Sequence, residues 1–315
     1  MRSVSLCPVC KPDCFVCQLF IRVKRRLDPL RGTNMCEMCM KHGEGKKWYL
    51  EASNYSEDLL SDMRRSKFLA QFFSETETIE KALKLCEKLD TAPWLVKRFF
   101  RWRMDRFFRK NHHGQVLPIE DVETIFGFTN SIVRFTCLCR TIAKSQEKRY
   151  CYGVSMGPRG GKLAELIDEV VPGFLDGPDA QGMETLSKEE AVMAFKEHER
   201  EGLCHSVWTF GTPFIGGICN CDRPDCMAMK TTVTHDIPSM YRAEYVAQLH
   251  PARCAGCRQC MRVCQFGALS YSGGNKKIVI DQRRCYGCGI CRAVCEKNAI
   301  HLEDRSNLPA VANLW

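Results

Sequence analysis

The chain has 315 residues, of which 45% are hydrophobic, and it carries a formal net charge of +9 at pH 7. This length allows one large domain or two to three smaller ones. Because the sequence contains no run of eighteen apolar residues and no secretion signal, we expect a cytoplasmic protein without a transmembrane segment. A reducing cytoplasm disfavours disulfides, so the 22 cysteines predict metal binding or redox chemistry.

The first cysteine-rich segment, residues 1–50, contains the stretches CPVCKPDCFVC and CEMCMKH. Two C-x2-C pairs, at residues 14–17 and 36–39, fit a four-cysteine zinc site. The first four cysteines could instead hold an iron–sulfur cluster or a second zinc ion, and without metal the segment would be an oxidisable leader. The candidate metal ligands are Cys7, Cys10, Cys14, Cys17, Cys36 and Cys39.

Residues 51–128 are expected to be mainly helical. Apolar residues recur at helical spacing at Ile79, Ala82, Leu83, Cys86 and Leu89. Ser74 and Glu77 are predicted to form a capping box at the start of this helix. Cys86 lies on the apolar stripe, and we interpret it as a core residue.

The segment 94–110 is basic and aromatic, with seven Lys or Arg residues and one Asp. Its predicted apolar stripe consists of Val96, Phe100, Met104 and Phe107. We favour packing of this stripe on the protein's own core or docking to a partner. Peripheral contact with an anionic membrane and binding of nucleic acid are the alternatives.

Residues 129–240 are predicted to form a small, cysteine-rich α/β domain. The stretch SIVRFTCLCR favours a strand, which would place the thiols of Cys137 and Cys139 on one face. A helix is predicted from the N-cap Ser187 to the C-cap region at Gly202. Cys204 is expected to be a small buried hydrophobe, and the neighbouring histidine a structural residue.

Six thiols of this region are predicted to meet across the fold. They belong to Cys137, Cys139, Cys151, Cys219, Cys221 and Cys226. Four thiolates suffice for a [4Fe–4S] cluster, so two thiols would remain. A zinc ion at these residues, or no metal, are the alternatives.

The C-terminal region, residues 241–315, contains the runs CAGCRQCMRVC and CYGCGICRAVC, which repeat the spacing C-x2-C-x2-C-x3-C. Four thiolates at this spacing can surround a cubane iron–sulfur cluster. Zinc seldom takes three ligands from so short a loop. The candidate ligands are Cys254, Cys257, Cys260, Cys264, Cys285, Cys288, Cys291 and Cys295.

These two runs closely resemble the bacterial two-cluster [4Fe–4S] ferredoxin domain, over about residues 241–305. The resemblance implies crossed ligation, in which each cluster takes three thiolates from one run and one from the other. Cys295 would join the first three cysteines of the first run, and Cys264 the first three of the second. Gln265 and Glu296 stand where the family usually has proline, which binds no iron.

Basic residues surround the two predicted cluster loops. The arginines are Arg253, Arg258, Arg262, Arg283, Arg284 and Arg292. Positive charge near an anionic cluster favours its reduced form and raises its potential. The same charge would suit an acidic docking surface, although a solvated face is the simpler interpretation.

Residues 130–305 also resemble a group of iron–sulfur proteins from anaerobes, in which a cysteine-rich domain precedes a ferredoxin module. The shared features are C-x-C-R, an isolated cysteine, GLxH and CNC. Asp222 stands where that group often has another cysteine. The stretch CEMCMKHGEGKKWYL resembles the opening of the same group.

Together these features predict a multidomain α+β protein. Its regions would be a metal-binding segment (1–50), a helical region (51–128), the α/β domain (129–240) and a ferredoxin-like domain of ββα repeats (241–315). We expect an iron–sulfur electron-transfer subunit of an anaerobic oxidoreductase that binds redox partner proteins. A catalytic middle cluster and a redox-sensing zinc and iron–sulfur regulator of nucleic acid are the alternatives. No catalytic side chains are predicted.

Overall fold

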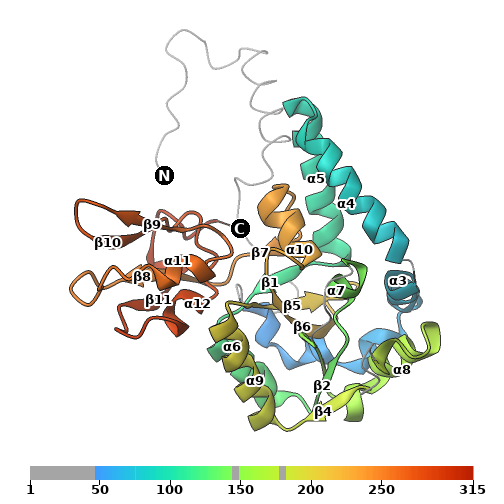
Figure 1. Ribbon diagram of the computed structural model, residues 1–315. Coiled ribbons are helices and arrows are strands. Elements are labelled where there is room, and N and C mark those ends of the chain that lie inside the picture. Colours follow the sequence, from blue (N-terminus) through green and yellow to red (C-terminus); the bar gives the residue numbers. More distant parts are fainter. Residues whose placement is uncertain (1–46, 75, 144–148, 177–181, 315) are drawn as a thin grey trace, which may run out of the picture.

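The computed structural model describes residues 47–74, 76–143, 149–176 and 182–314 (Figure 1). The candidate metal ligands at Cys7, Cys10, Cys14, Cys17, Cys36 and Cys39 lie outside these residues. None of the helices within the described ranges combines the length and the apolar character needed to cross a membrane.

Within the described ranges, seven strands form one sheet in the order β4-β2-β3-β6-β5-β1-β7. All neighbouring strands are antiparallel except β1 and β7, which are parallel. The strands are β1 (Gly114–Val116), β2 (Ser131–Phe135), β3 (Cys151–Ser155), β4 (Glu184–Leu186), β5 (Cys204–Thr209), β6 (Ile215–Cys221) and β7 (Met240–Tyr241). The sheet therefore contains residues from both sides of position 128, where the boundary between the helical region and the α/β domain was expected. The domain boundaries remain predictions.

Helices α6 (Ile119–Phe128) and α9 (Lys188–Glu201) lie side by side against one face of the sheet (Figure 1). Phe126 and Phe195 pack there on buried strand residues such as Ile218. The capping box of Ser187 and Glu190 is present, which confirms the predicted start of α9.

The other face of the sheet packs against α3 (Met63–Ser74) and α8 (Gly161–Val170). Leu69 and Leu163 belong to a core that also contains Trp208, Cys204 and Cys221. Because side chains alternate along a strand, the cysteines of β5 and β6 point away from α6 and α9.

Helices α4 (Thr76–Asp90) and α5 (Trp94–Asn111) form a projecting pair (Figure 1). Phe100, Met104 and Phe108 of α5 pack near Cys86, which confirms Cys86 as a core residue. Two expectations are wrong here. Val96 and Phe107 are about half exposed, and Ser74 ends α3, where its hydroxyl donates to the Ala70 carbonyl.

Residues 245–304, described without a gap, contain two halves that each run strand–helix–strand rather than in the predicted ββα order. The elements are β8 (Tyr245–Leu249), α11 (Gln259–Val263), β9 (Leu269–Ser272), β10 (Lys277–Ile280), α12 (Ile290–Ala293) and β11 (Ile300–Asp304). Strand β8 pairs with β11, and β9 pairs with β10. The short elements elsewhere are η1 (Trp48–Leu50), η2 (Ala52–Tyr55), η3 (Glu57–Ser61), α7 (Leu138–Ile142), η4 (Pro158–Gly160), η5 (Phe174–Asp176), α10 (Met227–Met229), η6 (Lys230–Thr234) and η7 (Arg305–Asn307).

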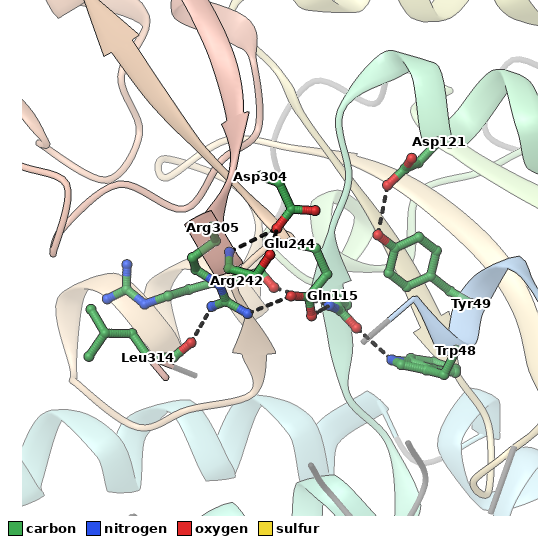
Figure 2. A network of polar contacts seen from close by, with 10 residues as sticks. Trp48, Tyr49, Gln115, Asp121, Arg242, Glu244, Asp304, Arg305 and Leu314 are labelled. Carbon is green, nitrogen blue, oxygen red and sulfur yellow. Dashed lines mark hydrogen bonds and ion pairs between the residues drawn. The ribbon is translucent and has the colours of Figure 1, made fainter. Parts of the chain in front are cut away.

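A buried polar network joins the sheet to the C-terminal region (Figure 2). Arg305 donates to Glu244 at 2.8 Å, and both side chains are 2% exposed. Gln115 of β1 donates to Glu244 at 3.4 Å and accepts from the Trp48 indole at 2.5 Å. This network links the start of the described chain, the sheet and the residues after β11.

Candidate iron–sulfur centres

The first centre is a cavity beside α12 that is lined by Cys264, Cys285, Cys288 and Cys291. Three of these residues come from the second cysteine run and Cys264 from the first. The grouping is therefore the crossed set that the ferredoxin resemblance implies. The rings of Phe266 and Tyr286, which also line the cavity, stack with their centroids 4.0 Å apart.

Backbone amides around this cavity donate to cysteine sulfurs. The amide of Ala268 lies 3.3 Å from the Cys264 Sγ, and those of Ala247 and Gly287 each lie 3.4 Å from the Cys285 Sγ. Gly287 has φ +72°, and a Cβ there would lie 2.1 Å from the Tyr245 carbonyl oxygen. Four sulfurs, two of which accept from backbone amides, suit an anionic [4Fe–4S] cluster, so these residues fit that group.

The second centre surrounds Cys260 on α11. Burial raises the pKa of Cys260 to about 11, with further increases from the nearby Cys257, Cys295 and Cys254. These are again the crossed partners. The Cys295 Sγ accepts from the amide of Ala299 at 3.4 Å. Its four sulfurs and this amide donor also fit a cubane cluster.

The two centres are neighbours, but they differ in their access to solvent. Cys260 and Cys291 are buried in one small core with Ala247 and Ile300. Cys257 is exposed at the second centre, and Arg253 and Arg258 beside it are also exposed. The second centre therefore lies closer to the surface.

The six predicted thiols of the middle region form a third group. The Cys151 and Cys219 sulfurs are 3.6 Å apart on paired residues of β3 and β6. From Cys151 the contacts continue to Cys137, Cys139, Cys226 and Cys221 in turn. The structure thus brings all six thiols together.

The local geometry around Cys137 and Cys139 differs from the prediction. Strand β2 ends at Phe135, and Cys137 is the N-cap of the short helix α7. The amide and hydroxyl of Thr141 both donate to the Cys137 carbonyl at 3.0 Å, which starts the helical turn. The two thiols meet through this turn and not through one strand face.

Arg140 joins the α7 segment to the stretch CNCDRPDC. Its guanidinium, 7% exposed, pairs with Asp222 at 3.0 Å and also with Asp225. It lies 4.6 Å above the centre of the Tyr150 ring. Asp222, at the position where a cysteine occurs in the resembling group, therefore fixes the two cysteine segments against each other.

Cys204 connects the third group to the first centre, and no spacing of cysteines along the chain predicts this contact. It is fully buried, as predicted. Its thiol also lies near the thiols of Cys288 and Cys226 in one core. The Cys204 thiol beside it lowers the pKa of Cys288.

Arg223 and Gln265 make a second connection between these two regions. The Arg223 guanidinium donates to the Gln265 carbonyl at 2.8 Å, and its amide donates to the side-chain oxygen at 3.0 Å. The Gln265 amide donates to the Gly202 carbonyl at 2.8 Å. Gln265, at the position of the usual proline, therefore attaches the ferredoxin-like loop to the end of α9 and to the turn after β6.

His205 has a structural role, as predicted. Its Nδ1 lies 2.6 Å from the Asn220 Oδ1, within the core formed with Phe195. Burial lowers the pKa of His205 to about 4, so the ring is neutral at pH 7.

Residues 253–300 match the family model of the 4Fe–4S dicluster domain. No curated protein and no solved structure matches the chain. The matched segment contains both cysteine runs. The C-terminal part of the chain is therefore an iron–sulfur domain of the ferredoxin-like kind, which supports two clusters and a role in electron transfer.

Proposed function

We propose that the chain is an electron-transfer protein with three [4Fe–4S] clusters that serves a larger anaerobic oxidoreductase in the cytoplasm. Two clusters occupy a bacterial-type ferredoxin module with crossed ligands. The third is held by the thiols of the middle region. When bound, such clusters exchange single electrons, while the protein sets their spacing, potential and exposure.

The observation that supports this proposal is the shared buried core in which Cys204 of β5 lies with Cys226 of the middle group and with Cys288 of the first centre. It joins the middle thiol group to the centre at Cys264, Cys285, Cys288 and Cys291. A row of three centres follows, from the middle group through this one to the centre at Cys257. Electrons could then pass between the interior of the sheet domain and the surface.

The surface near Cys257 is the proposed docking site for a redox partner. Arg253 and Arg258 are exposed on either side of this cysteine. An acidic partner would be attracted to such a surface, and its rate of association would fall as the ionic strength increases.

Iron, acid-labile sulfide and zinc should be measured per chain on protein purified without oxygen. Three cubanes predict about twelve irons and twelve sulfides, whereas the ferredoxin-like module alone predicts about eight of each. A result of about eight would contradict the third cluster. About one zinc in addition would support a zinc site among the cysteines of residues 1–50.

A further inference from the structure

The six thiols of the middle region are not held in the same way. A cubane cluster takes four thiolates, so two of the six have another role. Two features divide the six cysteines into a set of four and a set of two. The first is the kind of polar group near each sulfur, and the second is the position of each cysteine in the chain.

Four sulfurs lie close to polar groups other than thiols. The backbone amides of Arg140, Met227 and Met229 lie near the sulfurs of Cys137, Cys139 and Cys226, respectively. The hydroxyl of Ser206 lies 3.6 Å from the Cys221 sulfur. Backbone amides also donate to cysteine sulfurs in the two ferredoxin-like centres.

The same four cysteines are the ones that stand next to Arg140 and its partners in the two segments that this arginine joins, whereas Cys219 lies further back, in β6. Cys137 and Cys139 flank Leu138 directly before this arginine, and Cys221 and Cys226 flank its partners Asp222 and Asp225. The ion pairs fix the distance between these two pairs of thiols. This arrangement suits a pre-organised set of four metal ligands.

Cys151 and Cys219 differ from the other four because they face each other from adjacent antiparallel strands. The amide of Asn220 donates to the Tyr150 carbonyl at 2.9 Å, which makes Cys151 and Cys219 a non-hydrogen-bonded pair. The Cα atoms in such pairs are about 4.5 Å apart, within the range that a disulfide bridges. Their sulfurs, 3.6 Å apart, already point toward each other.

We propose that Cys151 and Cys219 form a redox-active dithiol beside a cluster held by Cys137, Cys139, Cys221 and Cys226. This inference rests on the third cluster of the proposed function. On reduction the Cys151–Cys219 disulfide takes up two electrons and two protons, its S–S bond breaks, and two S–H bonds form. The ferredoxin-like module, with its two clusters bound at the cysteines of residues 254–295, would supply the electron pair as two single electrons, and oxidation would reverse every step.

The test compares the wild-type chain with two matched double variants, all purified without oxygen. One combines Cys151→Ser with Cys219→Ser, and the other combines Cys137→Ser with Cys226→Ser. Each protein is equilibrated in dithiothreitol buffers of graded potential and then alkylated, and disulfides are located by peptide mass spectrometry. Iron is counted on the same samples.

We expect about twelve irons in the wild-type chain and in C151S/C219S, and about eight in C137S/C226S. The wild-type chain should form a Cys151–Cys219 disulfide with the slope of a two-electron couple, and C151S/C219S should form none. A loss of about four irons from C151S/C219S would identify these residues as ligands and overturn the proposal. A wild-type chain with twelve irons and no such disulfide would overturn it as well.

The outcome separates this inference from the proposed function. About eight irons in the wild-type chain would contradict the third cluster, whatever the state of the two thiols. If C151S/C219S does not fold, the alkylation pattern of the wild-type chain still decides whether the disulfide forms. The single variants Cys151→Ala and Cys219→Ala then replace the double variant for the iron count.

Discussion

At the scale of single residues, Arg140 shows how a charge can organise a thiol group. Its guanidinium is buried between two carboxylates and lies against the ring of Tyr150. Burial by itself lowers the pKa of this arginine, but the hydrogen bonds that it donates to Asp222 and the negative charge of Asp222 raise it above its usual value. The residue therefore stays charged and holds two cysteine segments at a fixed separation.

Replacing Arg140 with methionine should lower the free energy of unfolding by about 3 kcal/mol, because two carboxylates would remain without their cation. Iron bound by the middle thiols should be lost first on mild heating. The control is Arg134→Gln, because Arg134 pairs with Glu184 at 2.8 Å in a more exposed place. That exposed pair should be worth less than about 1 kcal/mol. Equal losses in both variants, measured by urea unfolding, would contradict a special role for Arg140.

At the scale of elements, short loops were easier to predict than the contacts between them. The ferredoxin-like ligands follow from spacing, because three thiols of each run come from one short loop. The helix after Ser187 was predictable because its capping box and Gly202 are local signals. Helix α7 was missed, because β-branched and aromatic residues continue to Phe135 and the turn depends on the Thr141 contacts.

The contact of Cys204 with Cys288 illustrates what sequence reasoning cannot supply. The two residues are far apart in the chain and share no spacing pattern. Their thiols meet because β5 and the loop before α12 pack together in the folded chain. The number of middle cysteines was sufficient to predict a thiol group, but not its connection to the ferredoxin-like domain.

Helix α5 provides a test of which face packs on the protein. Phe100 lies in a small core with Cys86 and Ile237, whereas Phe99 is 62% exposed. Phe100→Ala should therefore lower the free energy of unfolding by about 2 kcal/mol through lost burial. Phe99→Ala should change it by less than about 0.5 kcal/mol. Thermal unfolding of the two variants distinguishes the faces, and the reverse order would mean that the helix packs through its other side.

At the scale of the whole molecule, buried histidines make stability depend on pH. Burial lowers the pKa of His113 to about 3, and that of His112, His198 and His205 to about 4. Each of these values lies below the ordinary histidine value, so the folded state binds fewer protons than the unfolded state. Their stabilising contribution is complete above pH 6.5 and is lost as the pH falls toward 4. Glu199 acts in the opposite sense, because burial raises its pKa to about 7.

We therefore expect the urea midpoint to fall between pH 6.5 and pH 4. The slope of the free energy of unfolding against pH measures how many more protons the unfolded state binds than the folded state. In His205→Gln this difference should decrease by about one proton over this range. His250→Gln is the control, because His250 is exposed on the ferredoxin-like domain. An unchanged slope in His205→Gln would show that this ring is already protonated in the folded protein.

The network of Figure 2 should make the sheet and the C-terminal region unfold together. Arg305 and Glu244 are both almost completely buried, and Gln115 and Trp48 extend the contact into the sheet. Replacing only Arg305 by Arg305→Met removes the cation that pairs with the buried Glu244, which should cost about 3–5 kcal/mol. In the wild-type chain, loss of cluster absorbance and loss of far-ultraviolet circular dichroism should coincide on heating.

In Arg305→Met the loss of cluster absorbance should come at a lower temperature than the loss of circular dichroism, because the C-terminal region would no longer be attached to the sheet. Arg305→Met combined with Glu244→Met removes both charges, and it should recover much of the lost stability because a buried pair is often replaceable by apolar groups. Arg283→Gln is the surface control, because Arg283 is exposed in the same region. Coincident transitions in Arg305→Met would mean that other contacts, such as those of Arg223 with Gln265, are enough to couple the two parts of the molecule.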